Sequence, residues 1–167
     1  MTLLDAVATA LPQVPELRLL MIGAGAEEDG LRRRARQADL VGRVHFAGGM
    51  PRLDALAQLA GADLFVFASQ TETQGLVLAE ALAAGLPAVA LDGPGVRDSV
   101  RDGTDGVIVA AEPPAQSTAR LADAIAMVAI DRHRRRDMAE RAQADAGRFA
   151  VEQRVAQTEA LYRSALR

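Results

Sequence analysis

The sequence predicts an open α/β fold, in which a doubly wound, mostly parallel sheet carries helices on both faces. Short apolar runs alternate with helical patterns, and the connections between them are short, as in consecutive β-α units. The 167 residues suffice for one domain with one core, whereas a closed eight-fold barrel of such units needs about 250 residues. We therefore expect one domain over 1–167, ending in an alanine-rich helical tail over 116–166.

The elements of the first half begin with a helix. Apolar residues stand at helical spacing in the first segment, which Pro12 ends. The apolar run before Gly23 is typical of a buried strand. The next segment starts with acids and turns arginine-rich, which matches a helix dipole. The expected elements are a helix over 2–11, a strand over 17–22, a helix over 27–40, a strand over 43–47 and a helix over 52–61.

The second half continues the same alternation. Gly85 and then Pro87 stop a strongly apolar helix. Pro113 and Pro114 open the helical tail, which we expect to break near Gly147. The expected elements are a strand over 63–68, a helix over 75–84, a strand over 87–91, a loop over 92–95, a strand over 106–110 and then the tail.

The composition excludes several kinds of site. The chain has no cysteine, so it has no disulfide, thiolate metal site or cysteine nucleophile, and no lysine, so it has no Walker-type or Schiff-base lysine. Its two histidines, His45 and His133, are too far apart in sequence to form a local metal pair, and we expect no metal site and interpret His45 as structural. A net charge of −3 and only 3% aromatic residues argue against nucleic-acid binding.

Membrane insertion is also not indicated, because no apolar run reaches the roughly 18 residues of a spanning helix. The N-terminus does not resemble a signal peptide. Two arginine clusters, Arg32–Arg36 and Arg132–Arg136, could contact an anionic surface, but acids accompany the second, and we interpret both as solvated helix faces. We expect a cytoplasmic protein.

In open parallel sheets, ligands bind beyond the carboxyl ends of the strands. The first such segment, Gly23–Gly25, would let a ligand approach the backbone ahead of a helix N-terminus. The dinucleotide fingerprint fails there, because its third glycine would fall at Glu28. An ordinary tight turn is the alternative. The candidate segments are Gly23–Gly25, Ala47–Met50, Ser69–Gly75 and Asp92–Gly95.

The stretch Ser69–Gly85 is the most informative. Its helix is apolar nearly all round, so we expect it to be buried on most sides, and Glu80 is its only charge. A buried carboxylate must be paired or face a polar cavity. Glu72 stands eight residues earlier, and the free N–H groups of the first turn lie near Gln74, Gly75 and Leu76. This array suits a ligand with hydroxyls, then phosphates, then hydroxyls, as in a sugar nucleotide. The alternative is a glutamate on a narrow exposed stripe.

The same segments resemble a known family: the C-terminal, donor-binding half of retaining glycosyltransferases with the GT-B fold, of the family 4 or group 1 type. Glu72 and Glu80 fit its E-x7-E motif, and the register with the other segments makes the combination specific. The resembling segments are Leu20–Gly25, Arg43–Gly48, Ala62–Ser69, Glu80–Pro87 and Gly103–Gly106.

The resemblance implies a Rossmann-like domain that binds a nucleotide diphosphate sugar as substrate, without a cofactor or metal. It implies that Glu72 is catalytic and contacts the donor sugar, and that Glu80 holds the ribose hydroxyls. The backbone of three residues would cap the sugar and diphosphate, and glycines would line the cleft, with the loop after Gly48 near the base. The implied donor-binding residues are Gly23, Gly25, Gly48, Gln74, Gly75, Leu76 and Glu80.

The chain also departs from the family pattern. The family's first strand and the following loop, which bears an arginine and a lysine that hold the phosphates, have no counterpart, and the N-terminal acceptor-binding domain is absent. That strand lies in the middle of the sheet. Its loss would expose strand edges that direct pairing, a partner chain or disorder must resolve. Ala68 replaces a proline, and the residues Glu72–Gly75 resemble a variant seen in glycolipid glucosyltransferases.

We therefore expect half of a hexosyltransferase that moves a sugar to an acceptor hydroxyl, on a lipid or a saccharide, and that is inactive alone. Peripheral membrane association of the full enzyme stays open, as do the base, the sugar, the acceptor, the oligomeric state and whether the chain is a natural truncation or a split enzyme. Two alternatives are a non-catalytic nucleotide-sugar-binding module and a half-enzyme that needs a partner chain. A response-regulator-like domain would need a lysine, which the chain lacks.

Overall fold

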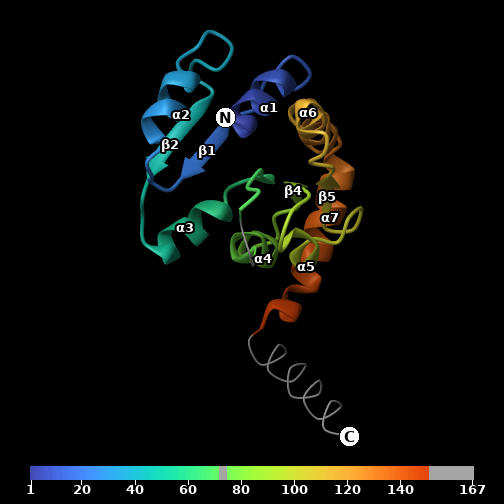
Figure 1. Cartoon of the computed structure of the whole chain (residues 1–167). Coiled ribbons are helices and arrows are strands. Elements are labelled where there is room, and N and C mark those ends of the chain that lie inside the picture. Colours follow the sequence, from blue (N-terminus) through green and yellow to red (C-terminus); the bar gives the residue numbers. More distant parts are fainter. Residues whose placement is uncertain (72–74, 151–167) are drawn as a thin grey trace, which may run out of the picture.

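The computed structural model describes residues 1–71 and 75–150 (Figure 1). Helices and strands alternate in the expected order. They are α1 Thr2–Ala10, β1 Leu19–Ile22, α2 Glu28–Ala35, β2 Val44–Gly48, α3 Arg52–Leu59, β3 Phe65–Phe67, α4 Leu76–Ala83, β4 Ala88–Leu91, α5 Val96–Ser99, β5 Gly106–Val109, α6 Pro114–Ile130, α7 Arg132–Ala144 and the 3-10 turn η1 Ala146–Phe149.

All the strand pairs are parallel, which confirms the α/β class, but the strands form two separate sheets. β1 pairs with β2, and Leu19 lies opposite Val44. β4 lies between β3 and β5, with Ala88 opposite both Phe65 and Gly106. Within the described residues, β1 and β3 each have one neighbouring strand. Direct pairing of β1 with β3, one of the three expected outcomes, is therefore not observed among these residues.

Helices cover both faces and join the two sheets. α1 packs along α6 (Figure 1), and their buried side chains form one core with β4 and β5; it includes Leu4, Val7, Val89, Val109, Leu121 and Ile125. The second core lies on the other face, where α4, α5 and α7 pack; it includes Phe67, Leu78, Leu82, Ala88, Val96 and Ala142. β4 is buried along its whole length, as an apolar strand with helices on both sides must be.

Three expectations about helices need correction. α2 ends at Ala35, five residues early, because Arg34 forms an ion pair with Asp39 in the turn that follows, and Leu40 is fully buried. The tail breaks near Gly147 as expected, where α7 ends at Ala144 and η1 follows, but it also breaks at Asp131, which ends α6 and accepts the Arg134 N–H at the start of α7. The segment after the 92–95 loop forms the short helix α5, which was not expected.

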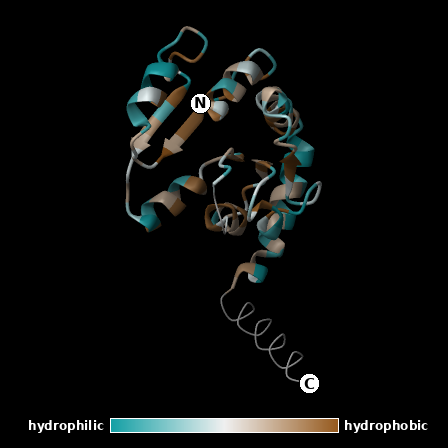
Figure 2. Ribbon diagram, viewed as in Figure 1, coloured by the Kyte–Doolittle hydropathy of each residue, from teal (hydrophilic) through white to brown (hydrophobic). Residues whose placement is uncertain are grey.

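The expectation that α4 is buried on most sides is also wrong. Leu78, Ala81 and Leu82 are buried, but Leu76 is 61% exposed and Val77 is 41% exposed. Val77 lines the space between the two sheets, so this part of the helix is not buried by the residues that the structure describes. β1 borders the same space, and its ribbon is coloured as strongly hydrophobic in Figure 2.

Candidate functional site

The loops after β1 and β2 meet at the carboxyl edge of their sheet. The Gly23 N–H donates to the Gly48 carbonyl at 2.9 Å, and both glycines have a positive φ, +127° and +73°. A Cβ placed on Gly23, Gly25 or Gly48 would touch nothing within 4 Å. These three predicted residues therefore border open space, which a ligand could enter close to the backbone.

The loops after β3 and β4 meet in the same way at their own carboxyl edge. Gly75 precedes α4 in a left-handed conformation, φ +61°, and a Cβ there would lie 2.9 Å from the Gly95 carbonyl oxygen. The Ser99 hydroxyl reaches the Gly75 carbonyl at 3.5 Å. Contact with the next loop thus fixes the start of α4, and Leu76 stands exposed beside it.

Glu80 is half-buried, with 27% of its side chain exposed, and it is paired. The Arg52 Nε and Nη2 both lie 2.7 Å from Glu80 Oε1. Arg52 is the first residue of α3, so this pair joins the loop after β2 to α4. Of the two sequence alternatives for Glu80, partial burial and a charged partner fit the paired carboxylate better than a glutamate on an exposed stripe.

Arg52 is a residue that sequence reasoning missed. Its partner lies 28 residues away, so no local pattern reveals the pair. One signal did exist: Arg52 closely follows the Ala47–Met50 loop, at the carboxyl edge of a parallel strand. Arg97 was missed as well; its guanidinium pairs with Asp92 at 2.6 Å, and this bond raises the pKa of Arg97. Arginine cations therefore stand near both sets of loops.

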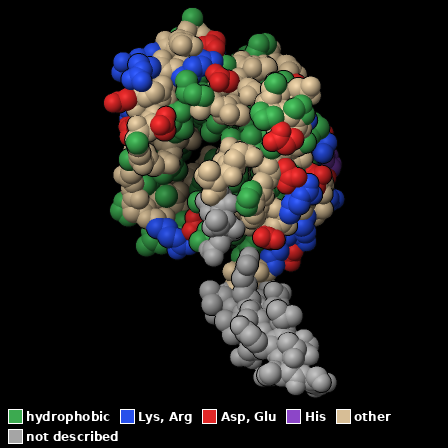
Figure 3. Space-filling model, viewed as in Figure 1, with side chains coloured by type: hydrophobic (Ala, Val, Ile, Leu, Met, Phe, Trp, Pro, Cys, Tyr) green, Lys and Arg blue, Asp and Glu red, His purple; other side chains and the backbone are tan. Residues whose placement is uncertain are grey.

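Glu80 and Arg52 line a cleft of about 1250 Å³ between the two sheets. The space-filling view shows the molecule hollowed there (Figure 3). Two predicted residues, the catalytic candidate Glu72 and the donor-binding candidate Gln74, lie outside the described residues. Six of the eight predicted site residues can thus be located: Gly23, Gly25 and Gly48 in one set of loops, and Gly75, Leu76 and Glu80 around α4.

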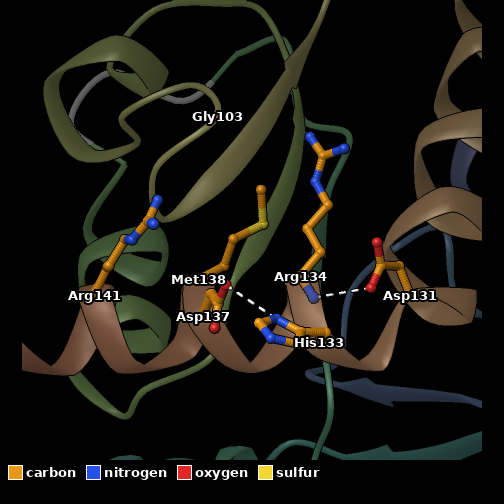
Figure 4. Close-up of a pocket in the computed structure, with 7 residues that line it drawn as sticks. All are labelled: Gly103, Asp131, His133, Arg134, Asp137, Met138 and Arg141. Atoms are coloured by element: carbon orange, nitrogen blue, oxygen red, sulfur yellow. Dashed lines mark hydrogen bonds and ion pairs between the residues drawn. The ribbon is translucent and has the colours of Figure 1, made fainter.

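A smaller pocket of about 200 Å³ lies elsewhere, between α7 and the turn at Gly103 (Figure 4). Gly103 precedes β5, so this pocket is at the amino edge of the sheet, away from the candidate site. His133 Nδ1 lies 3.1 Å from Asp137, and Arg136 bonds to Glu140. His133 and Arg136 are exposed, as expected of a solvated helix face, but Arg135 is only 16% exposed and donates to the Val128 and Ala129 carbonyls.

The first arginine cluster is less solvated than expected. Arg34 is 11% exposed and forms ion pairs with Asp5 at 2.7 Å and Asp39 at 2.8 Å, which raise its pKa. It therefore ties α2 to α1. Within residues 1–71 and 75–150, no group of three or more potential ligand side chains could hold a metal ion. In the same ranges, no helix has the length and apolarity that crossing a membrane requires.

Comparisons with known proteins agree on a family. Residues 1–145 match the family model described as "Glycosyl transferases group 1". A GDP-mannose-dependent alpha-(1-6)-phosphatidylinositol monomannoside mannosyltransferase of Mycobacterium tuberculosis is 33% identical over 141 residues, 78% of this chain and 36% of that enzyme. The chain thus spans about a third of the length of this relative.

Solved structures agree on the fold. The pneumococcal O-GlcNAc transferase GtfA, in complex with UDP and GlcNAc, superposes with a TM-score of 0.84 at 22% identity, over 99% of this chain and 33% of that one. Anabaena Alr3699/HepE in complex with UDP superposes with a TM-score of 0.74 at 27% identity, over 93% of this chain and 44% of that one. Both matches extend over nearly the whole chain.

Proposed function

Because the chain belongs to the group 1 glycosyl transferases and has the GT-B fold, we propose that it is the donor-binding half of a retaining glycosyltransferase. The observation that carries the proposal is the position of Glu80. It is the one charged residue of α4, half-buried beside a large cleft, and its partner Arg52 follows the carboxyl edge of β2. Such an edge is where nucleotides bind in open α/β sheets.

The roles of the other residues follow from the resemblance and from the local geometry. Gly23, Gly25 and Gly48 border open space, which supports close approach of a diphosphate or base to the backbone. Glu80 would accept hydrogen bonds from the ribose hydroxyls at its carboxylate, which Arg52 contacts at Oε1. The α4 N-terminus at Gly75 and Leu76 would face the diphosphate, whose charge a helix dipole favours. Glu72 and Gln74 would contact the sugar.

In the proposed reaction the bond between the sugar C1 and the diphosphate oxygen breaks, and the diphosphate departs with the electron pair. The acceptor hydroxyl forms the new bond to C1 on the same face of the sugar, and its proton passes to the departing diphosphate oxygen. Catalysis would come from stabilising the charge on the departing diphosphate by fixed dipoles and arginine cations. The donor is a substrate, and no cofactor enters this scheme.

The relatives suggest the substrate class. The mycobacterial relative is named for GDP-mannose and a phosphatidylinositol mannoside, and Alr3699/HepE is described with UDP. We propose a hexose donated by a nucleoside diphosphate to a hydroxyl of a glycolipid or saccharide. The full enzyme would then work in the cytoplasm, at the inner face of the membrane when its acceptor is a lipid.

Calorimetric titration of the chain with UDP, GDP and ADP tests donor binding. We expect one of the three to bind, and Glu80→Ala to weaken it by about tenfold or more, because a charge-assisted hydrogen bond to the ribose contributes roughly 1.5 kcal/mol or more. Glu140→Ala removes a glutamate of an exposed ion pair on α7 and serves as the matched control. Circular dichroism checks that both variants fold.

Two results would contradict the proposal. Failure of all three nucleotides to bind would remove the donor site, and equal affinity in the folded Glu80→Ala variant would remove the role of Glu80. We also expect the chain alone not to turn over a nucleotide sugar, because the acceptor-binding domain is required. The open cleft favours a second candidate, a half-enzyme that assembles with a separate chain; activity restored by such a chain would support it.

A further inference from the structure

Arg52 stands at a place in α3 that does not favour a cation. It is the first residue of the helix, where the positive end of the helix dipole lies. Pro51 precedes it with a φ of −55°, which the proline ring fixes, so the backbone itself defines the start of α3. Local helix stability thus gives no reason for an arginine here, and its contact with α4 does.

Arg52 and Glu80 lie on the sides of their helices that face the large cleft. On α4, Val77 and Glu80 line the cleft, and residues three apart share one face of a helix. On α3, lining residues recur at helical spacing; they include Arg52, Ala55, Leu56 and Leu59. The periodicity of the two helices therefore brings this arginine and this glutamate together at the wall of the cleft.

The ion pair uses one oxygen of the Glu80 carboxylate. Arg52 Nε and Nη2 each lie 2.7 Å from Oε1. A carboxylate oxygen has two lone pairs, so the guanidinium occupies Oε1, and neither of its two contacts uses Oε2. Two donors on one rigid plane also restrict the rotation of the carboxylate more than a single ammonium would. The pair thus fixes the direction in which Oε2 points.

The two side chains differ in exposure. Glu80 is 27% exposed, whereas Arg52 is 72% exposed. Among the residues that the structure describes, Arg52 is the one basic side chain that forms an ion pair with Glu80. A pair with an exposed partner contributes little to stability, because water screens it. The contact therefore matters more for the orientation of Glu80 than for the stability of the fold.

We propose that Arg52 is a positioning residue of the candidate donor site: by holding Oε1 of Glu80, it directs Oε2 to the adjacent ribose hydroxyls of a nucleoside diphosphate. This inference rests on the proposed function, in which Glu80 accepts from those hydroxyls. Arg52 follows the loop after β2, so it also ties Glu80 to that loop. Because Arg52 acts through Glu80, it sets the preference for ribose and leaves the affinity for the base and the diphosphate unchanged.

The test compares ribonucleotides with their 2′,3′-dideoxy forms, in calorimetric titrations of the chain with UDP, GDP, ADP and the three dideoxy counterparts. For the nucleotide that binds, we expect the ribose form to bind at least about tenfold more tightly, because its hydroxyls bond to a carboxylate. Arg52→Ala should reduce this ratio to about threefold or less, since a carboxylate without its support loses its orientation. The loss should fall on the ribose form alone. Arg52→Lys keeps the charge without the planar donors and should restore part of the ratio.

Three controls separate positioning from a general effect. Glu80→Ala should reduce the ratio by itself, and adding Arg52→Ala to it should change nothing further, because the two residues act as one unit. Arg136→Ala removes the arginine of an exposed pair with Glu140 on α7 and should leave both affinities unchanged. The melting temperature of Arg52→Ala should stay within about 3 °C of the parent value, as expected for an exposed pair.

The outcomes distinguish this inference from the proposed function. If none of the three ribonucleotides binds, the donor site fails, and the role of Arg52 fails with it. If a ribonucleotide binds and Glu80→Ala loses the preference for ribose while Arg52→Ala keeps it, the donor site stands and the positioning role is overturned. Equal weakening of the ribose and dideoxy forms in Arg52→Ala also overturns it, because the arginine would then act on the nucleotide directly or only on the fold.

Discussion

At the scale of single residues, arginine supplies every ion pair that a lysine could form in another protein, because the chain has no lysine. The planar guanidinium holds carboxylates in fixed positions, and the structure uses it between elements. Arg52 holds Glu80, Arg97 holds Asp92, and Arg34 joins Asp5 to Asp39. Removing one arginine should therefore disturb a junction between elements as well as the charge.

The Arg34 junction predicts a pH dependence. The hydrogen bond from Arg34 lowers the pKa of Asp39 in the folded protein. A lowered folded pKa contributes stability that is complete above the unfolded value, about 3.9, and is lost as the pH falls through the folded value. We expect Asp39→Asn to be less stable than the parent chain at pH 7 and equal to it near pH 2, in urea unfolding. An exposed carboxylate, Asp123, provides the control Asp123→Asn; an Asp39→Asn loss that persists undiminished at pH 2 would contradict the prediction.

Gly75 predicts a steric effect on the candidate site. A methyl group there would lie 2.9 Å from the Gly95 carbonyl oxygen, in a backbone conformation with φ +61°. Gly75→Ala should cost about 2 kcal/mol or more in unfolding free energy, because left-handed strain and the clash add. Gly42→Ala separates the two causes, since Gly42 has φ +74° with nothing within 4 Å, and should cost only about 1 kcal/mol. Equal losses in the two variants would show that the contact with Gly95 has no cost.

At the scale of elements, the turn before β5 is fixed by a buried acid. Asp105 is fully buried, accepts the Arg101 backbone N–H at 2.8 Å, and lies 2.9 Å from both the Arg101 and the Arg148 guanidinium groups. It thereby joins β5 to η1, beyond α7. Asp105→Ala should cost about 3 kcal/mol in urea unfolding, because it removes the buried carboxylate between two guanidinium groups, which then share only the half-exposed Asp145. Asp123→Ala, at an exposed site of α6, should change stability by less than about 0.5 kcal/mol. If Asp123→Ala lost as much stability as Asp105→Ala, the loss in Asp105→Ala would not be due to the buried ion pairs.

The order of the helices and strands was predictable from the sequence, but the burial of their side chains and the contacts between distant elements were not. Short apolar runs identified every strand, since a doubly covered sheet needs them, and two of these runs end just before Gly23 and Gly48. The break at Asp131 was missed because the alanine-rich residues before it and the arginine-rich residues after it both favour helix. The exposure of Leu76 and Val77 and the pairing of Arg52 with Glu80 both depend on the tertiary fold, which local sequence patterns do not reveal. Glu72 and Gln74 remain sequence predictions, because the structure does not describe them.

At the scale of the whole molecule, two sheets share one framework of helices. α1 against α6 and α3 against α4 are the junctions that hold the β1–β2 unit to the rest. The β4 strand is paired on both sides and buried in both cores, whereas β1 is paired on one side and half-exposed. Stability should therefore differ between the two sheets, because local opening follows the density of buried contacts.

This difference predicts two classes of backbone amide in native-state hydrogen exchange at low urea concentrations. Ala88 donates to the Asp105 carbonyl within the three-stranded sheet, and Leu19 donates to the Arg43 carbonyl within the two-stranded sheet. We expect Ala88 to exchange only through global unfolding, with the full urea dependence. Leu19 should exchange at least about tenfold faster and with a weaker urea dependence, because opening of the β1–β2 unit exposes less surface than global unfolding does. The same free energy and urea dependence at both amides would instead mean that α1 and α6 couple the two sheets into a single cooperative unit, and that the cleft stays open without any loss of cooperativity.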